Sequence, residues 1–508
     1  MTFTLVPGAL TLSQMHAWWR KPEPLRLEEA AWQAVATAEA TVAALLASGK
    51  VVYGVNTGFG ILARERIPFE QVEELQRRLV LSHMAGVGKA LPAKTVRLIL
   101  LLKIASLARG HSGVRRQTLQ ALLRLLEAKA LPVIPAQGSV GASGDLAPLA
   151  HLSGALIGEG EVWLQGEQLP AAAALGRIGL EPLRLGAKEG LALLNGTQVS
   201  TALALEGLFR AQEVAAAALA AGAMSVDACA ASDTPFDPRI QAVRLHPGQQ
   251  RAAAALRRLL AGSAIRESHR EDDPRVQDPY SLRCQPQVMG AVLDVLAAAG
   301  TILEREANAV SDNPLVFPAE GEMLSGGNFH AEPVGMAAEM IALALAETGA
   351  LSERRVALLT DATLSGLPAF LIARPGLNSG FMIAHVTAAA LASENKQLSH
   401  PAVVDSLPTS ANQEDHVSMA THGAYRLKRM AANTGRIVAI ELLAAAQGID
   451  LRRPLATGPA LAALHGKVRE KAAFLEIDRP FAPDIEAVYQ LVRDGSFLGE
   501  VWSEDRPW

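Results

Sequence analysis

The stretch TALALEGLFRAQEVAAAALAAGA, residues Thr201–Ala223, decides the fold class. It consists largely of alanine and leucine, and its few charged residues, Glu206, Arg210 and Glu213, recur at helical spacing. Alanine and leucine are among the strongest helix formers. A helix that is apolar nearly all round is buried inside a bundle or against other subunits. The stretch therefore predicts a long, buried helix.

Further Ala/Leu-rich stretches of the same character follow along the chain, at Pro286–Asn308, Pro333–Leu359, Phe381–Ser393 and Ser418–Gln447. The 508-residue chain is 50% hydrophobic but only 4% aromatic, which favours helices over strands. We predict a mainly α fold, a large bundle of long, mostly antiparallel helices. A loop-rich N-terminal portion over residues 1–196 is expected to carry the functional loops. Residues 197–508 are expected to form the long-helix bundle and the C-terminal helices.

The charge balance and the cysteine count narrow the class of protein. Lys and Arg number 47 and Asp and Glu 51, a formal net charge of −4, which is too balanced for a nucleic-acid or anionic-membrane binder. Two cysteines, Cys229 and Cys284, cannot form a disulfide framework. No segment is expected to span a membrane or to act as a secretory signal. We expect a cytoplasmic protein without nucleic-acid or membrane partners.

Polar and glycine residues gather most clearly in GSVGASGDLAPLAHL, residues Gly138–Leu152. Asp145 is well placed as the N-cap of a helix, and Pro148 falls in its first turn, where a missing N–H costs nothing. The tripeptide at 142–144 would then lie on a tight loop at the positive end of a helix, where developing negative charge is favoured.

Four interpretations of this loop compete. It can be an ordinary Gly/Ser loop. A phosphate-binding loop is a weaker interpretation, since neither GxxxxGK[ST] nor GxGxxG fits this segment. A nucleophile elbow fails, because Asp145 stands where Gly-x-Ser-x-Gly needs its last glycine. The fourth is specific: Ala-Ser-Gly is the tripeptide that cyclises and dehydrates to 4-methylidene-imidazol-5-one, an electrophile made from the backbone.

Together with this segment, several other motifs make the chain similar to the aromatic amino acid ammonia-lyases. They occur in that family's order along essentially the whole chain: YGVNTGFG (Tyr53–Gly60), LVLSHMAGVG (Leu79–Gly88), LLNGTQ (Leu193–Gln198), VQDPYSLRCQPQVMG (Val276–Gly290), SDNPLVF (Ser311–Phe317), GGNFH (Gly326–His330) and ANQEDHVSM (Ala411–Met419). Ala331 after GGNFH departs from the expected glycine.

The resemblance implies that the prosthetic group forms autocatalytically from Ala142, Ser143 and Gly144, with no external cofactor. It also implies elimination of ammonia from an amino acid. That reaction needs an electrophile, which no standard side chain supplies. Tyr53 would be the base that removes the β-proton. Tyr280 would lie beside the prosthetic group and assist proton movement.

Substrate contacts follow by the same resemblance. Arg283 would bind the substrate carboxylate, because a planar guanidinium can donate two hydrogen bonds to a carboxylate. Asn195 and Gln277 would bond the prosthetic-group carbonyl and the substrate, and Phe329 would line the ring pocket. Taken without their motifs, these residue types are more ordinary: a packed tyrosine, a surface ion-pair arginine, a helix-capping asparagine and a core phenylalanine.

Ser82-His83 matches the histidine-specific pattern of the family. His83 can hydrogen-bond an imidazole, and Glu414, which we count with the catalytic residues, can pair with the other ring nitrogen. The expected reaction is conversion of L-histidine to trans-urocanate and ammonia. The alternatives are a phenylalanine or tyrosine ammonia-lyase, an aminomutase of the same family, or a helical scaffold without chemistry.

The resemblance further implies a homotetramer whose active sites are shared between subunits. No metal site is expected, since no Cys/His spacing fits zinc, and His416 and His422 are interpreted as helix-face residues.

Overall fold

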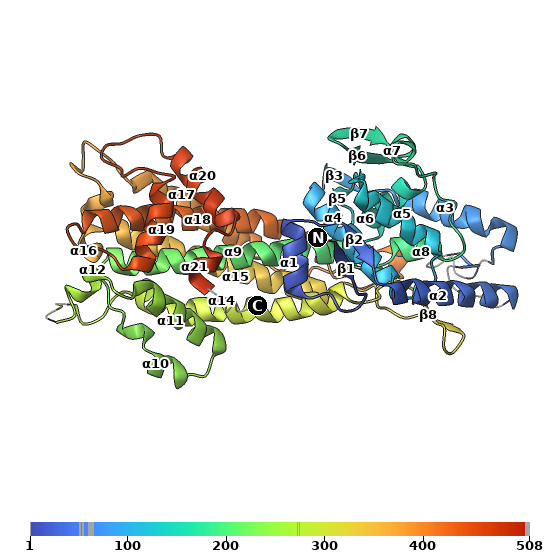
Figure 1. Cartoon of the computed structure of the whole chain (residues 1–508), viewed down its shortest axis with the longest axis horizontal. Coiled ribbons are helices and arrows are strands. Elements are labelled where there is room, and N and C mark those ends of the chain that lie inside the picture. The colour runs from blue at the N-terminus through green and yellow to red at the C-terminus, as the bar shows by residue number, and fades with distance from the viewer. Residues whose placement is uncertain are drawn as a thin grey trace. The chain divides into compact units, whose positions relative to one another are not determined.

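The computed structural model describes residues 2–49, 52, 55–58, 64, 66–271, 273 and 275–502. The chain divides into two compact units. The first comprises Met1–Glu206, Gly300–Glu339 and Pro401–Tyr425, and the second Gly207–Ala299, Met340–His400 and Arg426–Trp508. This division differs from the expected single cut after residue 196. The reason is that the long helices α9, α14, α15 and α18 each carry residues of both units. Figure 1 labels these four helices.

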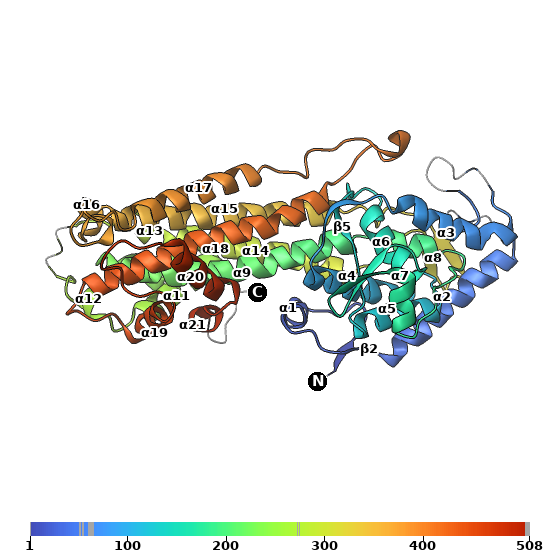
Figure 2. The same ribbon diagram turned by 90° about the horizontal axis from the view of Figure 1, so that it is seen from above.

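The predicted mainly α fold is confirmed. Long helices occupy the Ala/Leu-rich stretches: α9 (Gln198–Ala228), α14 (Gln285–Ala307), α15 (Glu332–Thr360), α17 (Met382–Leu398) and α18 (Ala420–Leu451). In α9 every residue except Arg210 is buried, as expected for a helix that is apolar all round. Figure 2 shows these helices from a second direction.

Within the second unit, a buried ion pair links the long helices. Arg355 of α15 and Glu441 of α18 are both inaccessible to solvent, and Arg355 Nε donates to Glu441 Oε1 at 2.5 Å. Ser225 of α9 and Ser352 of α15 also donate to the carboxylate, at 2.7 and 2.6 Å. A buried charge is tolerated only when it is paired and hydrogen-bonded. The pair therefore ties α9, α15 and α18 together in an otherwise apolar interior.

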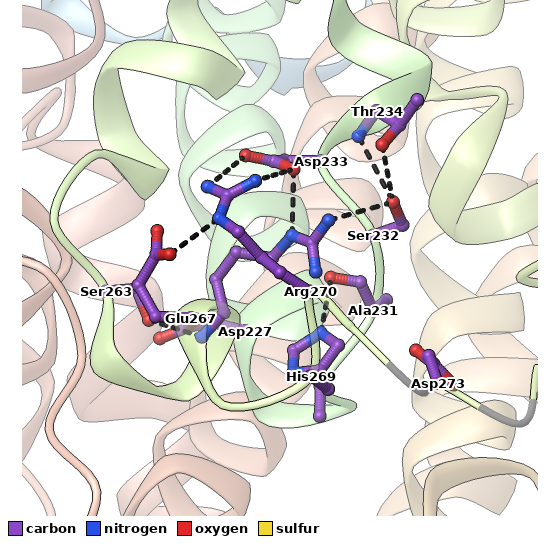
Figure 3. Close-up of polar contacts among 12 residues, drawn as sticks. Asp227, Ala231, Ser232, Asp233, Thr234, Ser263, Glu267, His269, Arg270 and Asp273 are labelled. Carbon is purple, nitrogen blue, oxygen red and sulfur yellow. Dashed lines mark hydrogen bonds and ion pairs between the residues drawn. The ribbon is translucent and has the colours of Figure 1, made fainter.

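The remaining helices of the second unit are shorter: α10 (Pro238–Ala242), α11 (Pro247–Leu260), α12 (Ala264–Glu267), α13 (Tyr280–Arg283), α16 (Ala362–Ser365), α19 (Pro459–Arg469), α20 (Ala482–Arg493) and α21 (Leu498–Trp502). Around α12, Arg266 and Arg270 both contact Asp233. Figure 3 shows Asp233 beside Arg270. Although partial burial opposes it, these two guanidinium groups lower the pKa of Asp233. The contacts hold the start of the segment that leads to α13.

The first unit combines short helices with small sheets. Its helices are α1 (Leu12–Arg20), α2 (Glu29–Ala47), α3 (Val72–His83), α4 (Ala93–Leu107), α5 (Arg116–Glu127), α6 (Leu146–Leu156), α7 (Ala171–Arg177) and α8 (Glu189–Leu194). Its strands are β1 (Phe3–Leu5), β2 (Leu25–Leu27), β3 (Val87–Ala90), β4 (Leu131–Pro132), β5 (Pro135–Gln137), β6 (Glu161–Leu164), β7 (Glu167–Pro170), β8 (Leu315–Phe317) and β9 (Glu322–Leu324).

The strands pair in small groups. β1 pairs with β2 in parallel; β3 with β5 and β8 with β9 pair antiparallel, and β4, β6 and β7 form one three-stranded antiparallel sheet. The β3–β5 pair adjoins two of the segments with predicted site residues, because α3 leads into β3 and the loop that contains Ser143 follows β5.

Three helices of the described chain are long and apolar enough that they could cross a membrane, although no membrane-spanning segment was expected. By length and composition alone, α2, α14 and α15 each contain an 18-residue window with no more than two charged residues. Within the chain, 22%, 50% and 67% of these windows are buried, respectively.

Candidate active site

The loop that contains Ser143 runs from the end of β5 to the start of α6. Its backbone is locked to Gly196: the Asp145 N–H donates to the Gly196 carbonyl at 2.8 Å, and Gly144 forms a parallel bridge with Gly196. Gly144 has φ +76°, and a Cβ there would lie 2.3 Å from the Gly196 carbonyl oxygen. Only glycine fits at position 144, because the nearest atoms are backbone and cannot rotate away.

Asp145 occupies the predicted N-cap position of α6, but its side chain makes no capping hydrogen bond to that helix. It accepts instead from the Ser200 N–H at 2.7 Å, in the first turn of α9, and from the Ser200 hydroxyl at 2.9 Å. Thr421 and Ser139 also donate to it, at 2.5 and 2.9 Å. Burial raises the pKa of Asp145, and these bonds oppose the rise. The prediction for Pro148 is confirmed: it is the third residue of α6.

Ser143 contacts two of the predicted site residues. Its hydroxyl donates to Glu414 Oε1 at 2.5 Å, and its carbonyl accepts from Asn195 Nδ2 at 3.0 Å. The second oxygen of Glu414 accepts from the Thr409 hydroxyl at 2.6 Å. Residues that are far apart in the sequence therefore hydrogen-bond the hydroxyl and the carbonyl of Ser143.

Two further segments of the chain donate hydrogen bonds to the loop that contains Ser143. The Ala331 N–H and the Ser418 hydroxyl both donate to the Gly141 carbonyl at 3.0 Å, and the Met419 N–H donates to Val140 at 2.9 Å. Ala331, the departure from the family motif, is fully buried. A Cβ on Gly141 would meet its methyl group at 3.3 Å, so a small residue at 331 suits this packing. Phe329, two residues earlier, is half-buried.

His83 ends α3 and is half-buried. Its Nδ1 lies 2.8 Å from the Leu79 carbonyl, which favours the tautomer with hydrogen on Nδ1 and leaves Nε2 as an acceptor. The chain after His83 reaches the Ser143 loop, since a Cβ on Gly138 would lie 3.1 Å from Gly86 Cα. The end of α3 is thereby held close to the start of this loop.

Lys103 is a site residue that sequence reasoning missed. It lies in α4, is almost fully buried, and donates through Nζ to the Asn195 carbonyl at 2.6 Å. Burial lowers its pKa to about 7, although Asp312 opposes the change. The signal was present in the sequence, as a lone lysine within the apolar run LILLLKIASL, residues 98–107.

Of the remaining predicted site residues, one is not described by the structure and three belong to the second unit. Tyr53 is outside the described residues. Gln277, Tyr280 and Arg283 belong to the second unit, and Tyr280 is 70% exposed. The Arg283 guanidinium lies 4.5 Å from the Tyr280 ring centroid, and its Nε donates to the Asp278 carbonyl at 3.0 Å. That these residues share a site with Ser143 stays a prediction.

The interpretation of His416 as a helix-face residue is wrong, because the chain does not become helical until Ala420. His416 is an exposed residue of the preceding loop, whereas His422 is an exposed residue of α18. The loop conformation brings His416 to His330, with ring centroids 5.7 Å apart.

Comparison with known proteins identifies the class. The profile of the aromatic amino acid lyase family matches residues 10–470, and the chain belongs to this family. It is similar to the histidine ammonia-lyase of Aromatoleum aromaticum, with 61% identity over 97% of this chain and 94% of that protein.

Solved structures of members of this family have the same fold as this chain. The crystal structure of histidine ammonia-lyase from Trypanosoma cruzi superposes with a TM-score of 0.91 at 42% identity, covering 99% of this chain and 95% of that one. The tyrosine aminomutase of Streptomyces globisporus superposes with a TM-score of 0.93 at 35% identity, covering 99% of both chains.

Proposed function

We propose that this chain is an ammonia-lyase, a carbon–nitrogen lyase that eliminates ammonia from L-histidine to give trans-urocanate. The observation that carries the proposal is the set of contacts at Ser143. Its hydroxyl is bonded to Glu414 and its carbonyl to Asn195, on a loop where only glycine fits at 144. The 61% identity to a histidine ammonia-lyase supports histidine as the substrate.

The residues present fit the 4-methylidene-imidazol-5-one group of this family. Forming that ring from Ala142, Ser143 and Gly144 needs small residues on a tight turn. Ala142 is buried, and Gly144 lies at a positive φ with no room for a side chain. Asn195 is placed to bond the carbonyl of the central residue. Once formed, the group would supply the electrophile that activates the substrate, and no external cofactor is needed.

The side chains of this chain would bind and orient the substrate. The Nε2 of His83 is available as an acceptor for a substrate imidazole N–H, and the Glu414 carboxylate can accept from the other ring nitrogen when the substrate imidazole is protonated. A carboxylate is unfavourable in an apolar ring pocket unless the substrate offers a polar partner, which histidine does and phenylalanine does not. Arg283 would hold the substrate carboxylate, Tyr53 would take the β-proton, and Gln277, Tyr280 and Phe329 would complete the site.

A phenylalanine or tyrosine ammonia-lyase, or an aminomutase, is the alternative within the family. The fold does not discriminate among these, since the Streptomyces globisporus aminomutase superposes as well as the Trypanosoma cruzi lyase. The pairing of Ser82-His83 with Glu414 favours histidine. Chromatography of the products would detect a β-amino acid if the chain were an aminomutase.

We further propose a cytoplasmic homotetramer with active sites shared between subunits. Large apolar side chains that would then be covered are exposed on α15, such as Met336 (53%) and Leu343 (57%), and on α17, such as Ile383 (63%). Light scattering of the purified protein would test the tetramer. Cell fractionation would test the location.

The decisive experiment follows near-ultraviolet absorbance after L-histidine is added to the wild type and to Ser143→Ala. Urocanate should appear with the wild type only. The intact mass of the wild type should fall short of the sequence mass by two waters, and that of Ser143→Ala should not. Full activity of Ser143→Ala would contradict the mechanism. Activity on phenylalanine or tyrosine but not histidine would contradict the substrate.

A further inference from the structure

A second cluster of polar side chains lies beside the Ser143 loop and takes no part in the proposed reaction. His330, Glu332 and His416 each place a donor atom within 4.8 Å of the others. His330 lies two residues before α15, Glu332 is the first residue of that helix, and His416 lies in the loop before α18. His330 and His416 are 86 positions apart in the sequence, which is why spacing along the chain did not suggest a metal site.

An independent observation at Glu332 supports a positively charged ligand at this cluster. Its Oε2 is buried and has no hydrogen-bond partner among the residues that the structure describes. A carboxylate oxygen that is withdrawn from water without a donor or a cation is unfavourable, so a buried oxygen of this kind calls for a positive partner. The two imidazoles beside it are further metal donors, and the exposed His416 gives an ion access from solvent.

We propose that His330, Glu332 and His416 form a binding site for a divalent transition-metal ion, with water completing its coordination. Two imidazoles and one carboxylate suit zinc and similar ions, whereas calcium and magnesium prefer ligands that are all oxygen. A ring nitrogen of His330 already lies 3.2 Å from the His416 carbonyl. Such a bond to a backbone carbonyl is how metal-bound histidines commonly use their second nitrogen.

The geometry needs only a local adjustment to bind the ion. Two ligands of a tetrahedral zinc ion, each about 2.0–2.1 Å from the metal, are roughly 3.4 Å apart. The donor atoms of the cluster, now up to 4.8 Å apart, must therefore approach one another by up to roughly 1.4 Å. His416 can supply this movement because its side chain is exposed and lies on a loop.

The ion would link the two segments that hydrogen-bond the Ser143 loop. Ala331, between the two ligands His330 and Glu332, donates to the Gly141 carbonyl. Glu414, two residues before the ligand His416, accepts from Ser143. Binding therefore links both supporting segments without touching the reacting atoms. The three ligands would stabilise these segments, and we expect the ion to raise thermal stability.

The test uses untagged, full-length protein that has been treated with a chelator and dialysed. Titration with Co²⁺ should produce visible absorption bands that saturate at one equivalent per chain, and Zn²⁺ should displace them. Zn²⁺ should also raise Tm. His416→Ala and Glu332→Gln should each weaken Co²⁺ binding at least tenfold and abolish the shift in Tm. His422→Ala, which removes an exposed histidine of α18 outside the cluster, is the matched control and should behave as the wild type.

Absence of saturable Co²⁺ absorption in the wild type would overturn the proposal. So would binding that is unchanged in both His416→Ala and Glu332→Gln, since the metal would then be held elsewhere. The site does not depend on the proposed reaction. Ser143→Ala should therefore bind Co²⁺ as the wild type does, even though it is expected to be inactive.

Discussion

Ser143 and Glu414 are 271 positions apart in the sequence, and the serine hydroxyl donates to the glutamate Oε1 at 2.5 Å. Asn195 bonds the carbonyl of the same serine, and Lys103 bonds the carbonyl of Asn195. The electrophile proposed to form at Ser143 would therefore lie at the end of a chain of hydrogen bonds that begins in the buried interior of α4.

Replacing the Glu414 carboxylate should impair turnover. Glu414→Gln keeps a group of similar size but removes the negative charge that would pair with the substrate imidazole, so we expect kcat/KM for L-histidine to fall by roughly 10²–10⁴-fold. Steady-state kinetics would measure this. Glu320→Gln, which changes an exposed carboxylate of the same unit, should retain wild-type kinetics. Equal activity of the two variants would remove Glu414 from the mechanism.

Adding a single methyl group at position 144 should prevent the loop from forming correctly. In Gly144→Ala the Cβ would lie 2.3 Å from the Gly196 carbonyl oxygen, at a φ that is strained for alanine. We expect a stability loss of roughly 1–3 kcal/mol and no loss of two waters in the intact mass. Gly176→Ala is the matched control: its Cβ would meet nothing within 4 Å, and it should change stability by no more than about 1 kcal/mol. A dehydrated, active Gly144→Ala would contradict the steric argument.

Breaking the buried ion pair of the second unit should be costly. Glu441→Gln leaves the fully buried Arg355 without its counter-charge, and we expect a loss of roughly 3–5 kcal/mol, seen as a lower urea midpoint. Glu486→Gln breaks the more exposed pair with Arg436 and should cost less than about 1 kcal/mol. Similar losses in both variants would show that burial does not set the strength of these pairs.

Lys103 should make stability rise with pH above neutrality. Its pKa is about 7 in the folded chain and 10.5 at its ordinary value, so between these values the unfolded chain binds a proton that the folded chain has released. The free energy of unfolding should therefore increase from about pH 7 to 10, with a slope of up to about 1.4 kcal/mol per pH unit. Below pH 7 the full cost of burying the charge is present.

Lys103→Met should lack this contribution. Urea denaturation of the wild type and of Lys103→Met at several pH values from 6 to 9 isolates it, because other titrating groups are common to both proteins. The wild type should gain stability relative to Lys103→Met as the pH rises. Parallel stability curves would show that Lys103 keeps its ordinary pKa.

Much of the fold was readable from the sequence, because helix formation depends on local composition. The stretch Thr201–Ala223 lies within α9, and the other long helices fall within a few residues of their predicted bounds. The tripeptide at 142–144 was likewise recognisable, since its chemistry depends on consecutive residues. The partners of Asp145 were not, because an N-cap is inferred from neighbours in the chain, while its actual partners include Ser200 and Thr421.

The sequence by itself determined the helical class, the family and the residue types that could act at the site. Only the tertiary structure decided which groups meet: Glu414 with Ser143, Lys103 with Asn195, and His416 with His330. The physical reason is that composition and periodicity act over a few turns of helix. Burial and hydrogen bonding, by contrast, depend on which distant segments the packed core brings together.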